Sequence, residues 1–198
     1  MIHPKYIRTN RLIALFVLVL SFLVYYDTMA PSVSYWDCGE FIAVSYTLGV
    51  PHPPGSPLFL LLGRMASILP FSEDIAFRVN LLSPLSSAFA VFFLYLIIVQ
   101  VVNHWRGKID TSRDALIAFG AGIVGSLTFA FTDSHWFNAV EAEVYAFSTF
   151  FTAIVVWLIL LWSQKADEEG HERYVLIIAY MIGLATGLHL LNLLTLPF

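Results

Sequence analysis

The first apolar segment of the chain runs from residue 12 to residue 29 and reads LIALFVLVLSFLVYYDTM. A helix needs roughly 20 apolar residues to cross the hydrocarbon core of a bilayer, so this segment is long enough to span a membrane. Further apolar segments of similar length follow along the chain. We predict about five transmembrane helices, over residues 12–29, 80–102, 115–131, 146–162 and 174–194.

The composition agrees with a membrane protein, because 59% of the residues are hydrophobic and only 12% are charged. Soluble domains carry about twice that charged fraction. We therefore predict an all-α polytopic membrane protein. Pro31 directly after Ala30 makes a poor cleavage site for a signal peptide, so the first segment is interpreted as a retained helix. The apolar run close to Phe198 suggests that residues 1–198 are the N-terminal part of a longer transmembrane domain.

The distribution of Lys and Arg predicts the orientation, since cytoplasmic loops carry the excess of these residues. With the N-terminus in the cytoplasm, only Arg64 and Arg78 lie outside. The basic residues on the cytoplasmic side are then Lys5, Arg8, Arg11, Arg106, Lys108, Arg113, Lys165 and Arg173. This bias places the long loop after the first helix on the outer face.

This first outer loop contains two predicted short helices. Residues 37–48 have the pattern of a short amphipathic helix, and residues 57–69 are apolar but too short to span comfortably. The second segment is better interpreted as a helix in the outer interface. Prolines between them, at positions 51, 53, 54 and 57, interrupt the helical pattern.

Polar groups from distant parts of the sequence converge on the outer interface in this topology. Ionisable groups at membrane depth are costly and suggest a functional site. A carboxylate there can take a proton from an incoming hydroxyl, and a protonated histidine or another cation can stabilise a phosphate leaving group. The candidate catalytic residues are Asp37, Glu40, Glu141 and Glu143, and the candidate substrate-binding residues are His52, Arg64, His135, Asn138, His189 and Asn192.

Simpler explanations stay open for several of these residues. Ser34 with Asp37, and Asn138 with Glu141, have the spacing of helix capping boxes. His189 in an apolar helix is compatible with a buried structural histidine, and Arg64 with a side chain that reaches the lipid headgroups.

A divalent cation is a candidate cofactor, because the four carboxylates are the hard oxygen ligands that Mg²⁺, Mn²⁺ or Ca²⁺ accept. The only cysteine is Cys38, which excludes an intramolecular disulfide and a Cys-rich metal site. The sequence has no Gly-rich phosphate loop and no basic surface for nucleic acid.

Three motifs resemble the GT-C superfamily of glycosyltransferases that use polyprenyl-phosphate sugars. They are residues 35–41 (YWDCGEF), 51–58 (PHPPGSPL) and 137–145 (FNAVEAEVY). The bacterial "domain of unknown function 2723" group, which is related to eukaryotic transmembrane protein O-mannosyltransferases, is the most similar. The resemblance implies that Asp37 is the catalytic base and that Glu141 or Glu143 belongs to a second acidic motif. Many relatives have Asp-Glu at the first position, whereas here Cys38 follows the aspartate and the glutamate is Glu40.

The resemblance also implies a reaction, in which a hexose is transferred with inversion from a polyprenyl phosphate to a protein Ser or Thr hydroxyl. Mannose is the hexose that the resemblance favours. The implied partners are the lipid-linked donor, a protein acceptor and the bilayer, and the implied location is a bacterial inner membrane. Because only some members of the superfamily use a metal, the resemblance does not imply a metal for this chain.

Two other classes of protein remain as alternatives. A transporter or flippase of a lipid-linked substrate would place its coupling groups near the midplane of the membrane, often within inverted repeats. A non-catalytic scaffold would use the polar residues only as helix caps.

Overall fold

The computed structural model describes residues 3–196, and the regular elements of this part of the chain are helices. Long helices are α1 (Pro4–Thr28), α5 (Leu82–Arg106), α6 (Ser112–Ala130), α8 (Val144–Ser163) and α9 (Glu172–Thr186). Short helices are α2 (Cys38–Thr47), α3 (Pro57–Ile68), α4 (Ile75–Asn80), α7 (Asp133–Ala139) and the 3₁₀ helix η1 (Leu190–Thr195).

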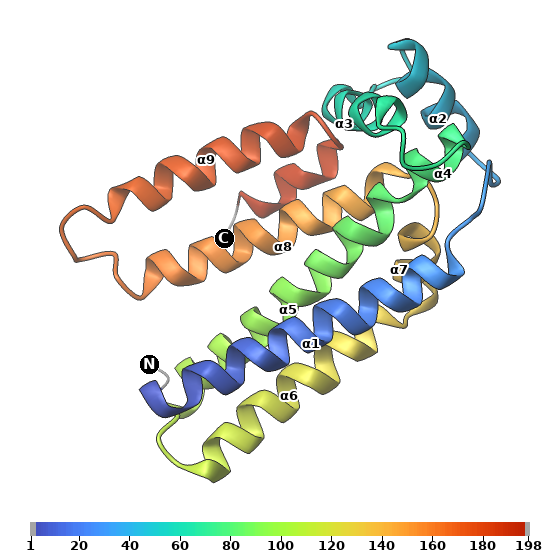
Figure 1. Ribbon diagram of the computed structural model, residues 1–198. Coiled ribbons are helices and arrows are strands. Elements are labelled where there is room, and N and C mark those ends of the chain that lie inside the picture. The colour runs from blue at the N-terminus through green and yellow to red at the C-terminus, as the bar shows by residue number, and fades with distance from the viewer. Residues whose placement is uncertain (1–2, 197–198) are drawn as a thin grey trace.

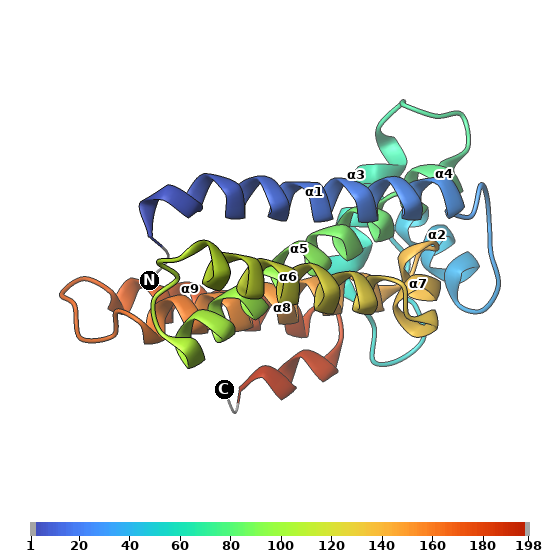
Figure 2. The same ribbon diagram turned by 90° about the horizontal axis from the view of Figure 1, so that it is seen from below.

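Four helical segments within residues 3–196 are long and apolar enough to cross a membrane: Pro4–Thr28, Ile75–Arg106, Ser112–Ala130 and Val144–Ser163. The prediction of an all-α polytopic membrane protein is thereby confirmed. The long helices lie side by side, and α2, α3, α4 and α7 gather at one end, opposite the N-terminus (Figure 1). In the second view, α1 lies on one side of α5 and α6 (Figure 2).

The prediction of a single helix over residues 174–194 is wrong, because α9 ends at Thr186. His189 has an extended backbone and its side chain accepts a hydrogen bond from the Leu191 amide, which starts η1. Asn192 donates to the carbonyl oxygens of Ala185 and His189 and so holds the turn. As a result, η1 folds back beside α8 (Figure 1).

The second span begins earlier than predicted, at Ile75 instead of residue 80. Asp74 accepts hydrogen bonds from the amides of Ala76 and Phe77, which satisfies two of the free donors at a helix start. The two short helices predicted in the first outer loop are present as α2 and α3. The short helices α4 and α7 were not predicted as separate elements.

Two apolar clusters organise the packing. The first lies between α1, α5 and α6 and includes the buried rings of Tyr25 and Tyr95. The second joins α2, α3 and α4 to the start of α8 and contains a row of edge-to-face rings, Phe41, Phe59 and Phe147. This second cluster supports the short helices that carry the acidic residues.

Candidate active site

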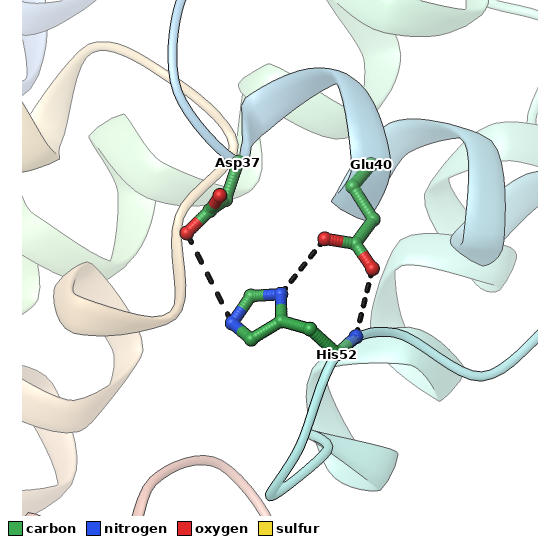
Figure 3. Close-up of polar contacts among 3 residues, drawn as sticks. All are labelled: Asp37, Glu40 and His52. Atoms are coloured by element: carbon green, nitrogen blue, oxygen red, sulfur yellow. Dashed lines mark hydrogen bonds and ion pairs between the residues drawn. The ribbon is translucent and has the colours of Figure 1, made fainter.

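Asp37 and Glu40 lie at the start of α2 and face the same histidine. Asp37 is the residue before the helix and Glu40 is in its first turn, a spacing that places both side chains on one side of the helix. The ring of His52 lies between them (Figure 3). Its Nδ1 is 2.7 Å from Glu40 Oε2, and its Nε2 is 3.9 Å from Asp37 Oδ2.

The loop after α2 brings His52 back to the start of that helix. Leu48 adopts a left-handed conformation with φ of 53°, and the Gly49 amide donates to the Val44 carbonyl, which ends α2. The backbone amide of His52 then donates to Glu40 Oε1 at 2.7 Å. Both oxygens of Glu40 therefore bind the same residue.

The contacts between Glu40 and His52 shift the pKa values of both groups in opposite directions. The side-chain hydrogen bond from His52 lowers the pKa of Glu40, and the hydrogen bond to Glu40 raises the pKa of His52. The negative charges of Glu40, Asp37 and Glu143 add to the second effect. The arrangement thus favours an imidazolium ion between two carboxylates.

The second acidic motif lies in the loop between α7 and α8. Glu143 directly precedes α8, yet its side chain makes no capping hydrogen bond. It is only 6% exposed, and burial together with the charge of Asp37 raises its pKa to about 7. Glu141 is 2% exposed, and its Oε1 has no hydrogen-bond partner among the described residues.

A small pocket unites the two acidic motifs. Asp37 and His52 form one part of its wall, and Glu143 and His189 form another. The ring of His189 packs against Tyr145, with centroids 5.2 Å apart. The remaining lining residues are Phe41, Pro54, Gly55, Ser56, Val144 and Tyr145.

A buried amide, which the sequence analysis missed, joins the segments that carry the acids. Asn80 is fully buried, and its Nδ2 donates to the carbonyl oxygens of Ala30 (2.9 Å) and Ser32 (2.8 Å). Its Oδ1 accepts from the amide of Ala142 at 3.0 Å and from Cys38 Sγ at 3.6 Å. Asn80 is uncharged and stands at the first position of a predicted apolar span, so the sequence did not indicate that it joins these segments.

Four of the predicted substrate-binding residues lie outside this pocket, and three of them have evident structural partners. Arg64 donates to the carbonyl oxygen of Tyr46 and lies over its ring. Asn192 accepts from Ser148 and Thr152 of α8. Asn138 donates to the Ser134 carbonyl within α7.

His135 is the fourth residue outside the pocket and packs between two rings. The centroids of Phe129 and Tyr25 are 4.3 Å and 6.0 Å from that of His135. Burial lowers its pKa to about 4, so the imidazole is neutral at ordinary pH. This environment is typical of a structural histidine.

The capping hypothesis does not account for the acidic residues. Asp37 precedes α2 but its side chain makes no capping hydrogen bond, and no helix begins at Asn138. Asp74 and Thr111 are the residues whose side chains cap α4 and α6.

The structure also shows where a cation would fit. Among residues 3–196, the one group of at least three His, Cys, Asp or Glu side chains with suitable spacing is Asp37, Glu40 and His52, whose nearest ligand atoms lie within 4.8 Å of one another. Both oxygens of Glu40 already accept hydrogen bonds from His52, so a cation would have to replace these bonds. We assign no step to a metal.

The fold and the pocket define a class of protein: a polytopic helical membrane protein with two acidic motifs that meet at one end of its long helices. Residues 37–198 match the model of the protein O-mannosyl-transferase TMEM260 N-terminal domain. The chain therefore belongs to this family.

Individual relatives agree with this assignment. The protein O-mannosyl-transferase tmem260 of Dictyostelium discoideum is 30% identical over 210 residues, which cover 98% of this chain and 24% of the relative. The mouse protein O-mannosyl-transferase TMEM260 is 28% identical over 159 residues, which cover 80% of this chain and 20% of the relative. The chain thus spans about a quarter or less of the length of these relatives. No solved structure matches.

Proposed function

We propose that the protein is a membrane glycosyltransferase that moves mannose from a polyprenyl phosphate to a Ser or Thr hydroxyl of a protein. The observation that carries this proposal is the meeting of Asp37, His52 and Glu143 in one pocket at the end of the apolar helices. The names of the relatives, which are protein O-mannosyl-transferases, support the choice of sugar and acceptor.

In the proposed mechanism Asp37 is the general base. Its carboxylate takes the proton of the acceptor hydroxyl while the hydroxyl oxygen forms a bond to the anomeric carbon of the sugar. The bond between that carbon and the phosphate oxygen breaks, the electron pair leaves with the polyprenyl phosphate, and the configuration inverts. Asp37 suits this role because its side chain is 56% exposed and accessible to an acceptor.

His52 and the second acidic motif surround the reacting groups in this proposal. A protonated His52 supplies positive charge for the phosphate that leaves. Glu143 lies across the pocket and contributes a carboxyl group that is partly protonated near neutral pH. With the N-terminus in the cytoplasm, as the basic residues predict, the pocket opens on the outer side of the membrane.

Replacement of Asp37 by Asn tests the role of the base. We expect transfer of labelled mannose from polyprenyl-phosphate mannose to protein to fall by about 10²- to 10⁴-fold, because general-base catalysis contributes that much. The assay uses membranes that contain the protein as its gene encodes it, at matched expression. Glu73→Gln is the control, since this exposed carboxylate lies outside the pocket.

The outcomes separate the proposals. Persistent transfer in the Asp37→Asn variant would remove Asp37 as the base and direct attention to Glu143. Absence of transfer by the wild type would contradict the proposed donor or acceptor.

Transport of a lipid-linked substrate is the second candidate. The acids of the two motifs lie at the start of α2 and just before α8, whereas transporters tend to bind substrate near the midplane. Transport would be supported if labelled donor crossed the bilayer of reconstituted vesicles without transfer of sugar to any acceptor.

A further inference from the structure

Glu40 and His52 form a contact with two hydrogen bonds to one carboxylate. The backbone amide of His52 donates to Oε1 and the ring Nδ1 bonds to Oε2, both at 2.7 Å. The backbone bond alone would leave the imidazole ring free to rotate. Together, the two bonds fix both the main chain and the side chain of His52.

The contact also selects which ring nitrogen carries a hydrogen. An ionised carboxylate is only an acceptor, so Nδ1 must be the donor to Glu40. The other nitrogen, Nε2, then faces Asp37 at 3.9 Å and the pocket. This is the logic by which a partner on one ring nitrogen determines the chemistry of the other.

The surroundings of His52 support a fixed ring. The ring of Phe41 packs against it, with centroids 5.9 Å apart. The ionisable groups that face it come from three elements: Asp37 and Glu40 from the start of α2, Glu143 from the loop before α8, and His189 from the turn before η1. Of these, only Glu40 is within hydrogen-bond distance of the His52 ring.

We propose that Glu40 is a positioning residue that acts through His52, and that it holds Nε2 of the imidazole toward Asp37 and the reacting groups. This inference rests on the proposed function and refines it, because it removes Glu40 from the candidate bases. It also explains why a glutamate three residues after the aspartate can serve here: the helix turn and the returning loop bring His52 between them.

A double-mutant cycle tests the proposal through activity. In Glu40→Gln the remaining oxygen can accept from the His52 backbone amide, but the amide nitrogen cannot accept from ring Nδ1, so the ring can no longer donate there. We expect Glu40→Gln and His52→Gln each to lower kcat by up to about 100-fold with little change in KM for the donor, and the double variant to lose no more than the single ones. Glu73→Gln should retain wild-type kcat.

A second measurement does not depend on sugar transfer. Nitrogen-15 NMR of histidine-labelled protein distinguishes the two ring nitrogens, and the His52 signal is the one that disappears in His52→Gln. In spectra recorded at a pH where the ring is neutral, the wild type should show its hydrogen on Nδ1. In Glu40→Gln the side-chain amide can donate to Nδ1, so the hydrogen should move to Nε2. Glu40→Asp keeps the charge but is one methylene shorter and loses the contact with Nδ1, so it should show a mixture of the two neutral forms of the ring even if Glu40→Gln folds poorly.

Independent losses that multiply in the double variant, or an unchanged His52 signal in both Glu40 variants, would overturn the proposal. If the wild type transfers no mannose, the NMR result still decides whether Glu40 fixes the ring. The positioning claim and the proposed reaction are thus tested separately.

Discussion

Glu143 combines burial with two neighbouring charges of the same sign. Its side chain is 6% exposed, and both Asp37 and Glu141 add to the effect of burial on its pKa. The environment raises the pKa from an ordinary value of 4.5 to about 7. The folded protein therefore holds a proton at a pH where the unfolded chain has already released it.

This shift predicts a pH-dependent stability. The proton on Glu143 stabilises the fold fully below pH 4.5, and that contribution is lost as the pH rises through about 7. The loss amounts to about 3 kcal/mol of the free energy of unfolding. Thermal unfolding in detergent at about pH 5 and about pH 8 should show a larger fall in Tm for the wild type than for Glu143→Gln. An equal fall in both proteins would contradict this account.

His135 provides the opposite pH dependence. Burial lowers its pKa from 6.5 to about 4, so its neutral form stabilises the fold above pH 6.5 and this contribution is lost as the pH falls through about 4. We expect His135→Phe to reduce the loss of Tm between about pH 6 and about pH 4. His104→Phe, at an exposed position near the end of α5, is the control.

At the scale of single residues, the sequence indicated which charged side chains lie together, but not the uncharged residue that holds their segments in place. Asp37, Glu40 and His52 could be grouped because their charges stand out in an apolar chain. Asn80 could not be predicted, since its role depends on contacts with residues 48 and 62 positions away in the sequence. The sequence likewise did not reveal that Arg64 donates to the backbone carbonyl of Tyr46 on another helix, and its substrate-binding role stays a prediction.

At the scale of elements, α2, which contributes Phe41 to the pocket, packs closely against α3 at a glycine. A methyl group added at Gly63 would lie 2.8 Å from the Cβ atom of Ser45, too close for van der Waals contact. The sequence revealed both helices through their apolar pattern and the prolines between them, but not this close approach. It also missed the end of α9, because the polar contacts of Asn192 outweigh the continuing apolar pattern.

The close contact predicts that Gly63→Ala separates α2 from α3. We expect a destabilisation of about 1–3 kcal/mol, as for other overpacked positions, together with reduced transfer activity. Gly120→Ala is the matched control, because an added methyl group there meets no atom within 4 Å. The control should be stabilising by about 0.5–1 kcal/mol, since alanine is the better helix former. Equal stability of the two variants would show that α2 and α3 can adjust.

At the scale of the whole molecule, the long helices separate two chemically different ends. The helices α2, α3, α4 and α7 lie at one end, and the loop between α5 and α6 lies at the other (Figure 1). The pocket is lined by residues of α2 and of the loops before α3 and α8. The basic residues of the predicted cytoplasmic side include Lys108 in that loop. The sequence predicted this division from charge alone, whereas the contacts that close the pocket required the structure.

Labelling of introduced cysteines tests the orientation. Cys38 is fully buried, so the protein without an introduced cysteine should react little with a maleimide. An impermeant maleimide added outside intact cells should label Glu73→Cys but not Lys108→Cys, which should react only after the membrane is opened. The reverse pattern would place the pocket on the cytoplasmic side.

The hydrogen bonds of Asn80 also constrain when the pocket can form during synthesis. This amide binds Ala30 and Ser32 in the loop after α1, and also Ala142, which the ribosome adds much later. The first acidic motif therefore reaches the membrane long before the chain that completes its surroundings. Until Glu143 and His189 have been added to the chain, Asp37 and His52 lack the opposite wall of the pocket, and the nascent protein has no assembled site.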